Sequence, residues 1–198
     1  MLKIMVVDDH AERACTLARV LTESGYHVVA QVAANDYLPA RITEAQPDVI
    51  LIDVDAPSRD TLEQVSAIHR ETPRPVIMFS NNDDRETIAA AIAAGVSAYQ
   101  VDGLAHSKVQ PIIDVAIAHF QRFQKLQNEL DKAQSTLASR KLIDRAKGVL
   151  MAQKQLTEPQ AYRTLQKLAM DRKRRLVDVA RDVIEMADLL SNKTESHT

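Results

Sequence analysis

The sequence predicts an α/β fold, in which a doubly wound, five-stranded parallel sheet precedes a coiled-coil helix and a small all-α domain of three helices. Three observations support this prediction: short apolar runs alternate with amphipathic stretches, a heptad pattern follows them, and the later apolar residues recur at helical spacing. The 198 residues are 45% apolar and 26% charged, which is an ordinary globular composition. This composition excludes a disordered or collagen-like chain.

Five short apolar runs are the predicted strands. Each run is nearly continuous rather than alternating, which is typical of strands buried on both faces of a parallel sheet. The runs are residues 4–7, 28–32, 49–52, 76–79 and 98–101. Between them, residues such as Leu17, Val20 and Leu21 have the spacing of amphipathic helices. The single cysteine, Cys15, excludes an internal disulfide, and we expect it to be a small buried side chain.

A heptad pattern predicts a coiled-coil stem that joins two copies of the chain. Its positions are Ile113, Ala116, Phe120, Phe123, Gln127, Leu130, Gln134 and Leu137. The alternative is one long amphipathic helix that packs on its own domain. Three helices follow the stem, and Thr157 with Gln160 predicts a capping box at the start of the middle one.

These patterns divide the chain into four segments. We expect an α/β domain at residues 1–112, a dimerisation stem at 113–138, a helical domain at 139–190 and a flexible tail at 191–198. Residues 1–138 carry 12 basic and 19 acidic side chains, whereas residues 139–198 carry 13 basic and 8 acidic ones. The basic end indicates a nucleic-acid partner. No apolar run approaches the ~20 residues that cross a bilayer and no signal peptide is recognised, so we expect a cytoplasmic protein without a membrane partner.

Polar side chains follow several of the predicted strands. Asp8 and Asp9 follow the first strand, Asp53 ends the third, Ser80 follows the fourth and Tyr99 lies in the fifth. The carboxyl ends of parallel strands meet at one edge of the sheet, so these residues converge there. Three carboxylates repel one another unless a hard cation lies between them. We therefore expect Asp8, Asp9 and Asp53 to hold Mg²⁺.

This set of residues resembles the two-component receiver domain over about residues 1–112. The resemblance implies that Asp53 is the phosphoacceptor, that Ser80 and Tyr99 are the switch residues, and that a sensor kinase is a partner. Receivers carry a lysine three residues after the switch aromatic, where this chain has Asp102. An acidic residue there repels a phosphoryl group, so two interpretations remain open: a working phosphoacceptor, or a retained fold that serves another input.

The basic end contains the candidate RNA-binding residues. Gly148 lies in the middle of a predicted helix, where glycine costs about 1 kcal/mol relative to alanine. We expect another helix or a ligand to approach its bare backbone. The candidates are Arg140, Lys141, Arg145, Lys147, Gly148, Met151, Lys173, Arg174 and Arg175.

The stretch at residues 137–190 resembles the ANTAR domain, the RNA-binding module of antiterminating response regulators. The run at residues 146–151, with Ala161, Val179 and Ala180 at matching intervals, carries this resemblance. It implies a homodimer that binds paired stem-loops in a leader RNA and prevents formation of a terminator. Over the whole chain the resemblance is to NasT-type nitrate and nitrite assimilation regulators, which implies a nitrate-sensing inhibitory partner protein.

Two other functions are open on the sequence alone. The first is a response regulator that binds duplex DNA through a helix-turn-helix, although its recognition helix begins with Glu158 and Pro159 rather than with hydrogen-bond donors. The second is a dimerising docking protein that binds no nucleic acid. We do not expect an enzyme, because the six histidines are scattered and no nucleophile lies in a recognisable catalytic motif.

Overall fold

The computed structural model describes residues 1–101 and 109–194 of the chain. The elements are β1 (Lys3–Asp8), α1 (Ala11–Glu23), β2 (His27–Val32), α2 (Leu38–Ala45), β3 (Val49–Val54), α3 (Arg59–Glu71), β4 (Val76–Ser80), α4 (Arg85–Ala94), β5 (Ala98–Val101), α5 (Val109–Lys154), α6 (Glu158–Arg172) and α7 (Leu176–Thr194). They form two units, Met1–Lys125 and Leu126–Thr198, which we describe separately. In the described part of the chain, no helix combines the length and the apolar character needed to cross a bilayer.

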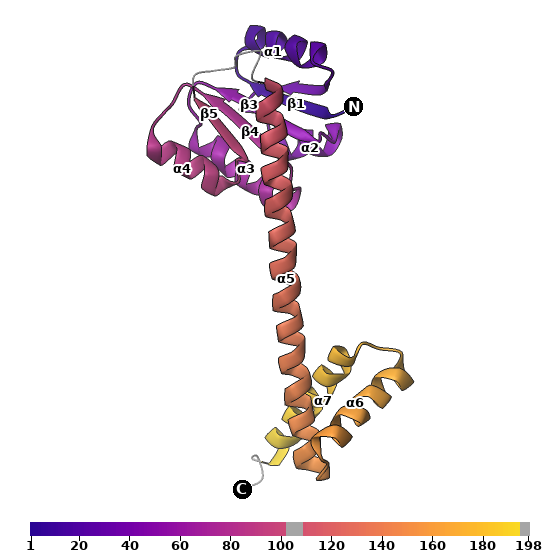
Figure 1. The fold of residues 1–198 in the computed structure, drawn as a ribbon. Coiled ribbons are helices and arrows are strands. Elements are labelled where there is room, and N and C mark those ends of the chain that lie inside the picture. Colours follow the sequence, from indigo (N-terminus) through magenta and orange to yellow (C-terminus); the bar gives the residue numbers. More distant parts are fainter. Residues whose placement is uncertain (102–108, 195–198) are drawn as a thin grey trace. The chain divides into compact units, whose positions relative to one another are not determined.

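The first unit is a sheet of five parallel strands in the order β2-β1-β3-β4-β5, with helices on both faces (Figure 1). Helices α2, α3 and α4 pack on one face, while α1 and the first turns of α5 pack on the other. The central strands β3 and β4 are buried along their whole length, and β1 is buried after Lys3. The predicted doubly wound sheet is therefore confirmed: three of the five apolar runs are its buried central strands β1, β3 and β4, and the other two are the partly buried edge strands β2 and β5.

The start of α5 belongs to the sheet domain. Ile113 and Ala116 are fully buried in its core, against residues of α1 and the sheet. The heptad pattern places both residues in a dimer seam, so this part of the prediction is wrong. Between residues 125 and 138, by contrast, every side chain of α5 is exposed.

The second unit packs the end of α5 against α6 and α7. Its buried core consists of Ala146, Leu150, Ala161, Leu165, Ala169, Val179, Ala180 and Ile184. The first of the three expected helices is not separate, because α5 continues without a break to Lys154. The capping box at the start of α6 is confirmed, since the Thr157 amide donates to Gln160 Oε1 at 2.9 Å. Helix α6 ends at Arg172, and the residue that caps it, Lys173, has a left-handed φ of 52°.

Two smaller expectations differ from the structure. Cys15 is exposed rather than buried, because it lies beside the buried face that α1 forms with Ala14, Leu17, Ala18 and Leu21. Helix α7 extends to Thr194, so residues 191–194 are helical where we expected a flexible tail.

Candidate functional site

The acidic residues of the sheet domain gather at the carboxyl ends of β1, β3 and β4. Asp8 lies opposite Asp53 in the register of β1 and β3, and Ser80 lies opposite Val54 in the register of β3 and β4. Asp8, Asp53 and Ser80 are all buried. The topology therefore brings the predicted receiver residues together at one edge of the sheet.

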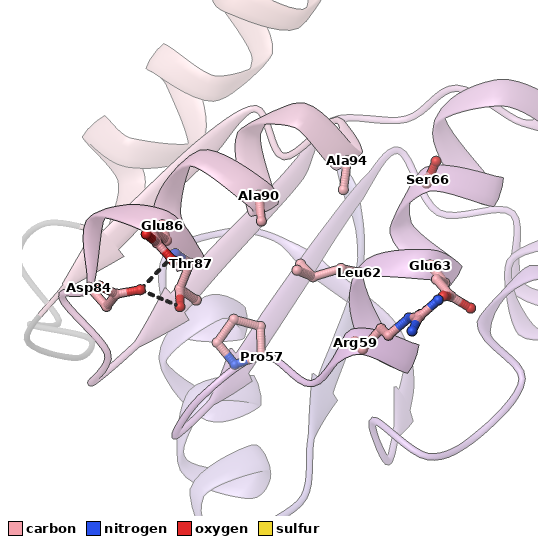
Figure 2. Close-up of a pocket in the computed structure, with 10 residues that line it drawn as sticks. All are labelled: Pro57, Arg59, Leu62, Glu63, Ser66, Asp84, Glu86, Thr87, Ala90 and Ala94. Carbon is pink, nitrogen blue, oxygen red and sulfur yellow. Dashed lines mark hydrogen bonds and ion pairs between the residues drawn. The ribbon is translucent and has the colours of Figure 1, made fainter.

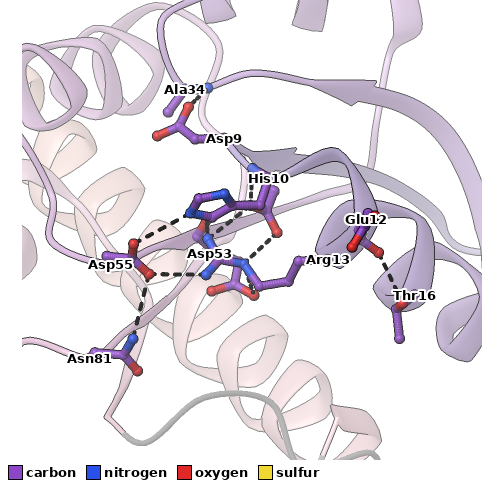
Figure 3. Close-up of polar contacts among 10 residues, drawn as sticks. Asp9, His10, Glu12, Arg13, Thr16, Ala34, Asp53, Asp55 and Asn81 are labelled. Carbon is purple, nitrogen blue, oxygen red and sulfur yellow. Dashed lines mark hydrogen bonds and ion pairs between the residues drawn. The ribbon is translucent and has the colours of Figure 1, made fainter.

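Arg13, in the first turn of α1, inserts its guanidinium among these carboxylates (Figure 3). Its Nε donates to Asp8 Oδ2 at 2.8 Å, and its Nη2 donates to Asp8 Oδ1 at 2.9 Å. The Nε atom also lies 3.4 Å from Asp53 Oδ2, and Nη1 donates to Asp55 Oδ1 at 3.0 Å. One cation thus contacts three carboxylates that come from two strands and the loop after β3.

The carboxylates as arranged do not fit Mg²⁺. Receiver domains generally bind Mg²⁺ at this acidic edge, and Mg²⁺ requires several oxygen ligands in octahedral geometry. Here both Asp8 oxygens accept hydrogen bonds from Arg13, while Asp9 Oδ1 accepts one from the Ala34 amide at 2.9 Å. Among the described residues, no group of three or more His, Cys, Asp and Glu side chains is placed to hold a metal. The predicted set of Asp8, Asp9 and Asp53 is not assembled as a ligand group around a cation site.

The electrostatics of the edge follow from burial and from Arg13. Burial raises the pKa of Asp53 above its ordinary value, and the nearby Arg13 guanidinium offsets part of this rise. The hydrogen bond from Arg13 lowers the pKa of exposed Asp55. The hydrogen bond to Asp8 raises the pKa of Arg13, which therefore stays charged.

The predicted switch residues are joined through the loop between β4 and α4. Ser80 Oγ donates to the Asp55 carbonyl at 2.9 Å and accepts from the Asn82 amide at 3.1 Å. The Tyr99 hydroxyl donates to the Asn82 carbonyl at 2.9 Å. Asp102, at the position of the receiver lysine, lies outside the described residues.

Arg13 and Asp55 were not among the residues predicted from the sequence. Asp55 follows Asp53 by two positions, and Arg13 follows Asp8 by five, so both lie near the motif that the sequence shows. The sequence places an arginine in the helical turn that follows the acidic pair, and in the structure this arginine pairs with Asp8.

A groove of about 530 Å³ lies between α3 and α4 (Figure 2). Three of its charged residues have partners within the groove lining. Asp84 Oδ2 accepts from the Thr87 amide and hydroxyl at 2.9 Å each, and Arg59 Nε donates to Glu63 Oε1 at 2.8 Å. These contacts cap and brace the two helices, so we assign no site to the groove.

The second unit carries the predicted RNA-binding residues, and Lys147 is the most constrained of them. Lys147 Nζ lies 2.7 Å from Asp144 Oδ1 and 2.7 Å from Glu158 Oε1, and its side chain is only 15% exposed. The hydrogen bond to Asp144 raises the pKa of Lys147 and lowers that of Asp144. Because Glu158 begins α6, Lys147 links the end of α5 to the next helix.

Three more of the predicted cations are paired. Arg145 binds Asp188 at 3.1 Å, and Arg175 Nε donates to Asp178 Oδ2 at 2.9 Å. Arg174 pairs with Asp182. Within the described part of the unit, the other three predicted cations form no ion pair; they are Arg140, Lys141 and Lys173. Among the predicted RNA-binding residues, these three are therefore the cations most available to a phosphate.

Gly148 lies on the exposed side of α5, and so does Met151. A Cβ built on Gly148 would meet no atom within 4 Å. Close approach of another helix of this chain therefore does not explain the glycine. Of the two reasons that we expected for a bare backbone, only a ligand or another molecule remains.

Comparison with known protein families matches both units. Residues 4–101 match the response regulator receiver domain, and residues 131–184 match the ANTAR domain. ANTAR regulators bind RNA, and receiver domains interact with sensor kinases. The second match begins within the exposed part of α5 and ends in α7.

Relatives support the same assignment. The transcriptional regulatory protein PdtaR of Mycobacterium tuberculosis (strain H37Rv) is 30% identical over 92% of this chain and 89% of its own length. The nitrate regulatory protein of Klebsiella oxytoca is 32% identical over 46% of this chain and 23% of its own length. A protein-glutamate methylesterase of Halobacterium salinarum (strain R1) is 31% identical over 48% of this chain and 28% of its own length.

Among solved structures, the receiver domain of the putative response regulator NarL from Mycobacterium tuberculosis has a TM-score of 0.51. It is 25% identical, and the match covers 58% of this chain and 95% of that domain. The ordered sheet domain, the helical unit and the full-length similarity to PdtaR lead to one conclusion. The chain belongs to the family of response regulators in which a receiver domain is followed by an ANTAR domain.

Proposed function

We propose that this chain is a cytoplasmic, non-enzymatic transcription antitermination regulator of nitrate and nitrite assimilation genes. It binds paired stem-loops in a leader RNA and prevents formation of a terminator. The observation that carries the proposal is the ANTAR match at residues 131–184, on a unit whose basic side chains outnumber its acidic ones. The similarity to a nitrate regulatory protein supports the choice of pathway.

The proposed regulator is a homodimer joined through α5. Phe123, Leu130 and Leu137 follow one another at seven-residue intervals and are 48%, 50% and 57% exposed. Apolar side chains repeated at this interval along an exposed helix are typical of a coiled-coil seam. The occupant we propose for this seam is a second copy of the chain, which brings two RNA-binding units to two linked stem-loops.

RNA contacts are proposed to start from the cations that have no carboxylate partner. Arg140 and Lys141 lie on α5, about two turns before Gly148, and Lys173 lies between α6 and α7. Single-stranded loops present base edges and phosphates to such residues. In this proposal Lys147 acts mainly by holding α5 to α6, since two carboxylates already surround it.

The receiver is the proposed input domain. Two inputs remain in this proposal: phosphorylation of Asp53 by a sensor kinase, or binding of a nitrate-sensing protein that inhibits the regulator. Ser80 and Tyr99 would report either event to the loop between β4 and α4, with which both form hydrogen bonds. In this proposal Mg²⁺ binds Asp8, Asp9 and Asp53 only when the Arg13 side chain has left Asp8.

A binding assay with the full chain tests the proposal. We would measure affinity for a two-hairpin leader RNA, a single hairpin and duplex DNA at a fixed salt concentration. The two-hairpin RNA should bind most tightly. Preference for DNA would favour a helix-turn-helix regulator, and absence of binding to all three would favour a docking protein; either result overturns the proposal.

Matched variants assign the binding to the ANTAR unit. Lys141→Ala and Lys173→Ala each remove an unpaired cation, and both should weaken RNA binding without loss of the helical fold. Lys125→Ala removes an exposed cation of α5 that precedes the ANTAR match, and serves as the control. Equal effects of all three substitutions would show that the binding is nonspecific attraction to positive charge.

A further inference from the structure

The carboxyl edge of the receiver concentrates negative charge in a small space. Asp8 and Asp53 are buried neighbours on β1 and β3, and Asp55 lies just beyond them. Like charges at such distances repel strongly unless a cation lies between them. In this chain a side chain of the protein is that cation, because the Arg13 guanidinium contacts all three carboxylates.

The position of Arg13 excludes a second cation from the same oxygens. Asp8 Oδ1 accepts from the His10 amide at 2.8 Å and from Arg13 Nη2 at 2.9 Å, and Asp8 Oδ2 accepts from Arg13 Nε at 2.8 Å. The Nη2 atom also donates to the Asp53 main-chain oxygen at 3.2 Å. Carboxylate and main-chain oxygens of this kind are the ligands that Mg²⁺ needs. A metal would have to displace a bidentate, charge-assisted pair before it could bind.

Arg13 is also connected, through Asp55, to Ser80 and to the loop between β4 and α4. Asp55 accepts from Arg13 through its side chain, and its carbonyl accepts from Ser80 Oγ at 2.9 Å and from the Asn81 amide at 3.2 Å. The start of α1 is therefore connected through one residue to the loop that follows β4. The receiver is braced across its carboxyl edge without a metal.

We infer that Arg13 is the built-in counter-ion of this receiver, so that the acidic edge is neutralised without a divalent cation and is closed to one while Arg13 remains on Asp8. Displacement of Arg13 opens the edge. The inference concerns the receiver alone and stands or falls independently of RNA binding.

Metal titration of the full chain tests the inference. Mn²⁺ serves as the probe, because free and bound Mn²⁺ differ in their electron paramagnetic resonance signal and Mn²⁺ accepts the same oxygen ligands as Mg²⁺. Arg13→Ala should bind Mn²⁺ at least about tenfold more tightly than the parent chain, because the substitution removes a positive charge that repels Mn²⁺ at contact distance. Arg19→Ala, which removes an exposed arginine of the same helix, should bind like the parent.

Thermal unfolding gives the second readout. Mg²⁺ should leave the Tm of the parent and of Arg19→Ala unchanged. Arg13→Ala should have a lower Tm in a chelator, because buried Asp8 loses its partner, and Mg²⁺ should restore part of the loss. If Arg13→Ala does not fold in the chelator, it should fold when Mg²⁺ is added, and Arg13→Gln should show the same dependence.

Three results would overturn the inference. The first is binding of Mn²⁺ to the parent as tightly as to Arg13→Ala. The second is an increase of the parent Tm on addition of Mg²⁺. The third is a destabilised Arg13→Ala chain that neither binds Mn²⁺ more tightly nor recovers with Mg²⁺, since this would give Arg13 a purely structural role.

Discussion

Replacement of Gly148 by alanine should stabilise the protein while weakening its binding to RNA. Gly148 lies inside α5, and an added Cβ meets no atom within 4 Å, so the substitution introduces no clash. Alanine is favoured over glycine in a helix interior by about 0.8–1 kcal/mol. For a unit of the size of residues 126–198, this corresponds to an increase in Tm of about 4–8 °C.

The RNA effect tests why this position lacks a side chain. If RNA approaches the backbone of Gly148, a methyl group there should weaken binding by tenfold or more, an effect of about 1.4 kcal/mol. Circular dichroism melts and hairpin-binding titrations on the same preparation give both values. A weaker affinity with a higher Tm cannot result from misfolding.

Two outcomes would refute this reasoning. A lower Tm would mean that the space beside Gly148 is occupied in solution, for instance by a second copy of the chain. An unchanged RNA affinity would mean that RNA does not come close to this turn of α5. Ser139→Ala, a substitution nine residues earlier on the same helix, controls for a general effect of alanine on helix stability.

Three further predictions concern the stem, the ANTAR core and the acidic edge. Leu130→Glu should weaken dimer formation at least about 30-fold. Each of the two copies loses the burial of a leucine that is half-exposed in the single chain, which is worth about 1 kcal/mol per copy. Sedimentation would show an unchanged dimer if the seam were elsewhere. Leu165→Ala should lower the free energy of unfolding by about 2–5 kcal/mol, since Leu165 is fully buried in a small core, and a denaturant melt that shifts by less would contradict this. Asp53→Asn should raise the Tm at pH 7. Burial raises the pKa of Asp53, so the folded protein favours the protonated carboxyl. The stability that this protonated form provides is complete below about pH 4, and it is lost as the pH rises through the folded-state pKa. The advantage of the variant should therefore disappear as the pH falls towards 4, and a constant difference at all pH values would exclude this cause.

Much of the fold follows from local sequence patterns. Continuous apolar runs predict the strands, and the carboxyl-edge rule places Asp8 near Asp53 without any knowledge of the coordinates. The capping box at Thr157 is a local motif whose geometry depends only on nearby residues, and it was predicted correctly.

Long-range side-chain partners were not predictable in the same way. Arg13 reaches residues 40 and 42 positions away, and a pattern within α1 contains no information about them. The heptad step of Ile113 and Ala116 is equally compatible with a dimer seam and with packing on a sheet, and tertiary contacts decide between them. Cys15 lies one position from the buried face of α1, a difference that helical spacing alone resolves poorly.

The ion pairs of the ANTAR unit have a consequence for selectivity among RNAs. Four of its seven predicted RNA-binding cations are held by carboxylates, and the other three form no ion pair. If these three cations make the phosphate contacts of the proposed complex, few counterions are released on binding, and the affinity should vary only weakly with salt concentration. Recognition then depends on the shape and spacing of the hairpins, which distinguishes one leader from the excess of other transcripts.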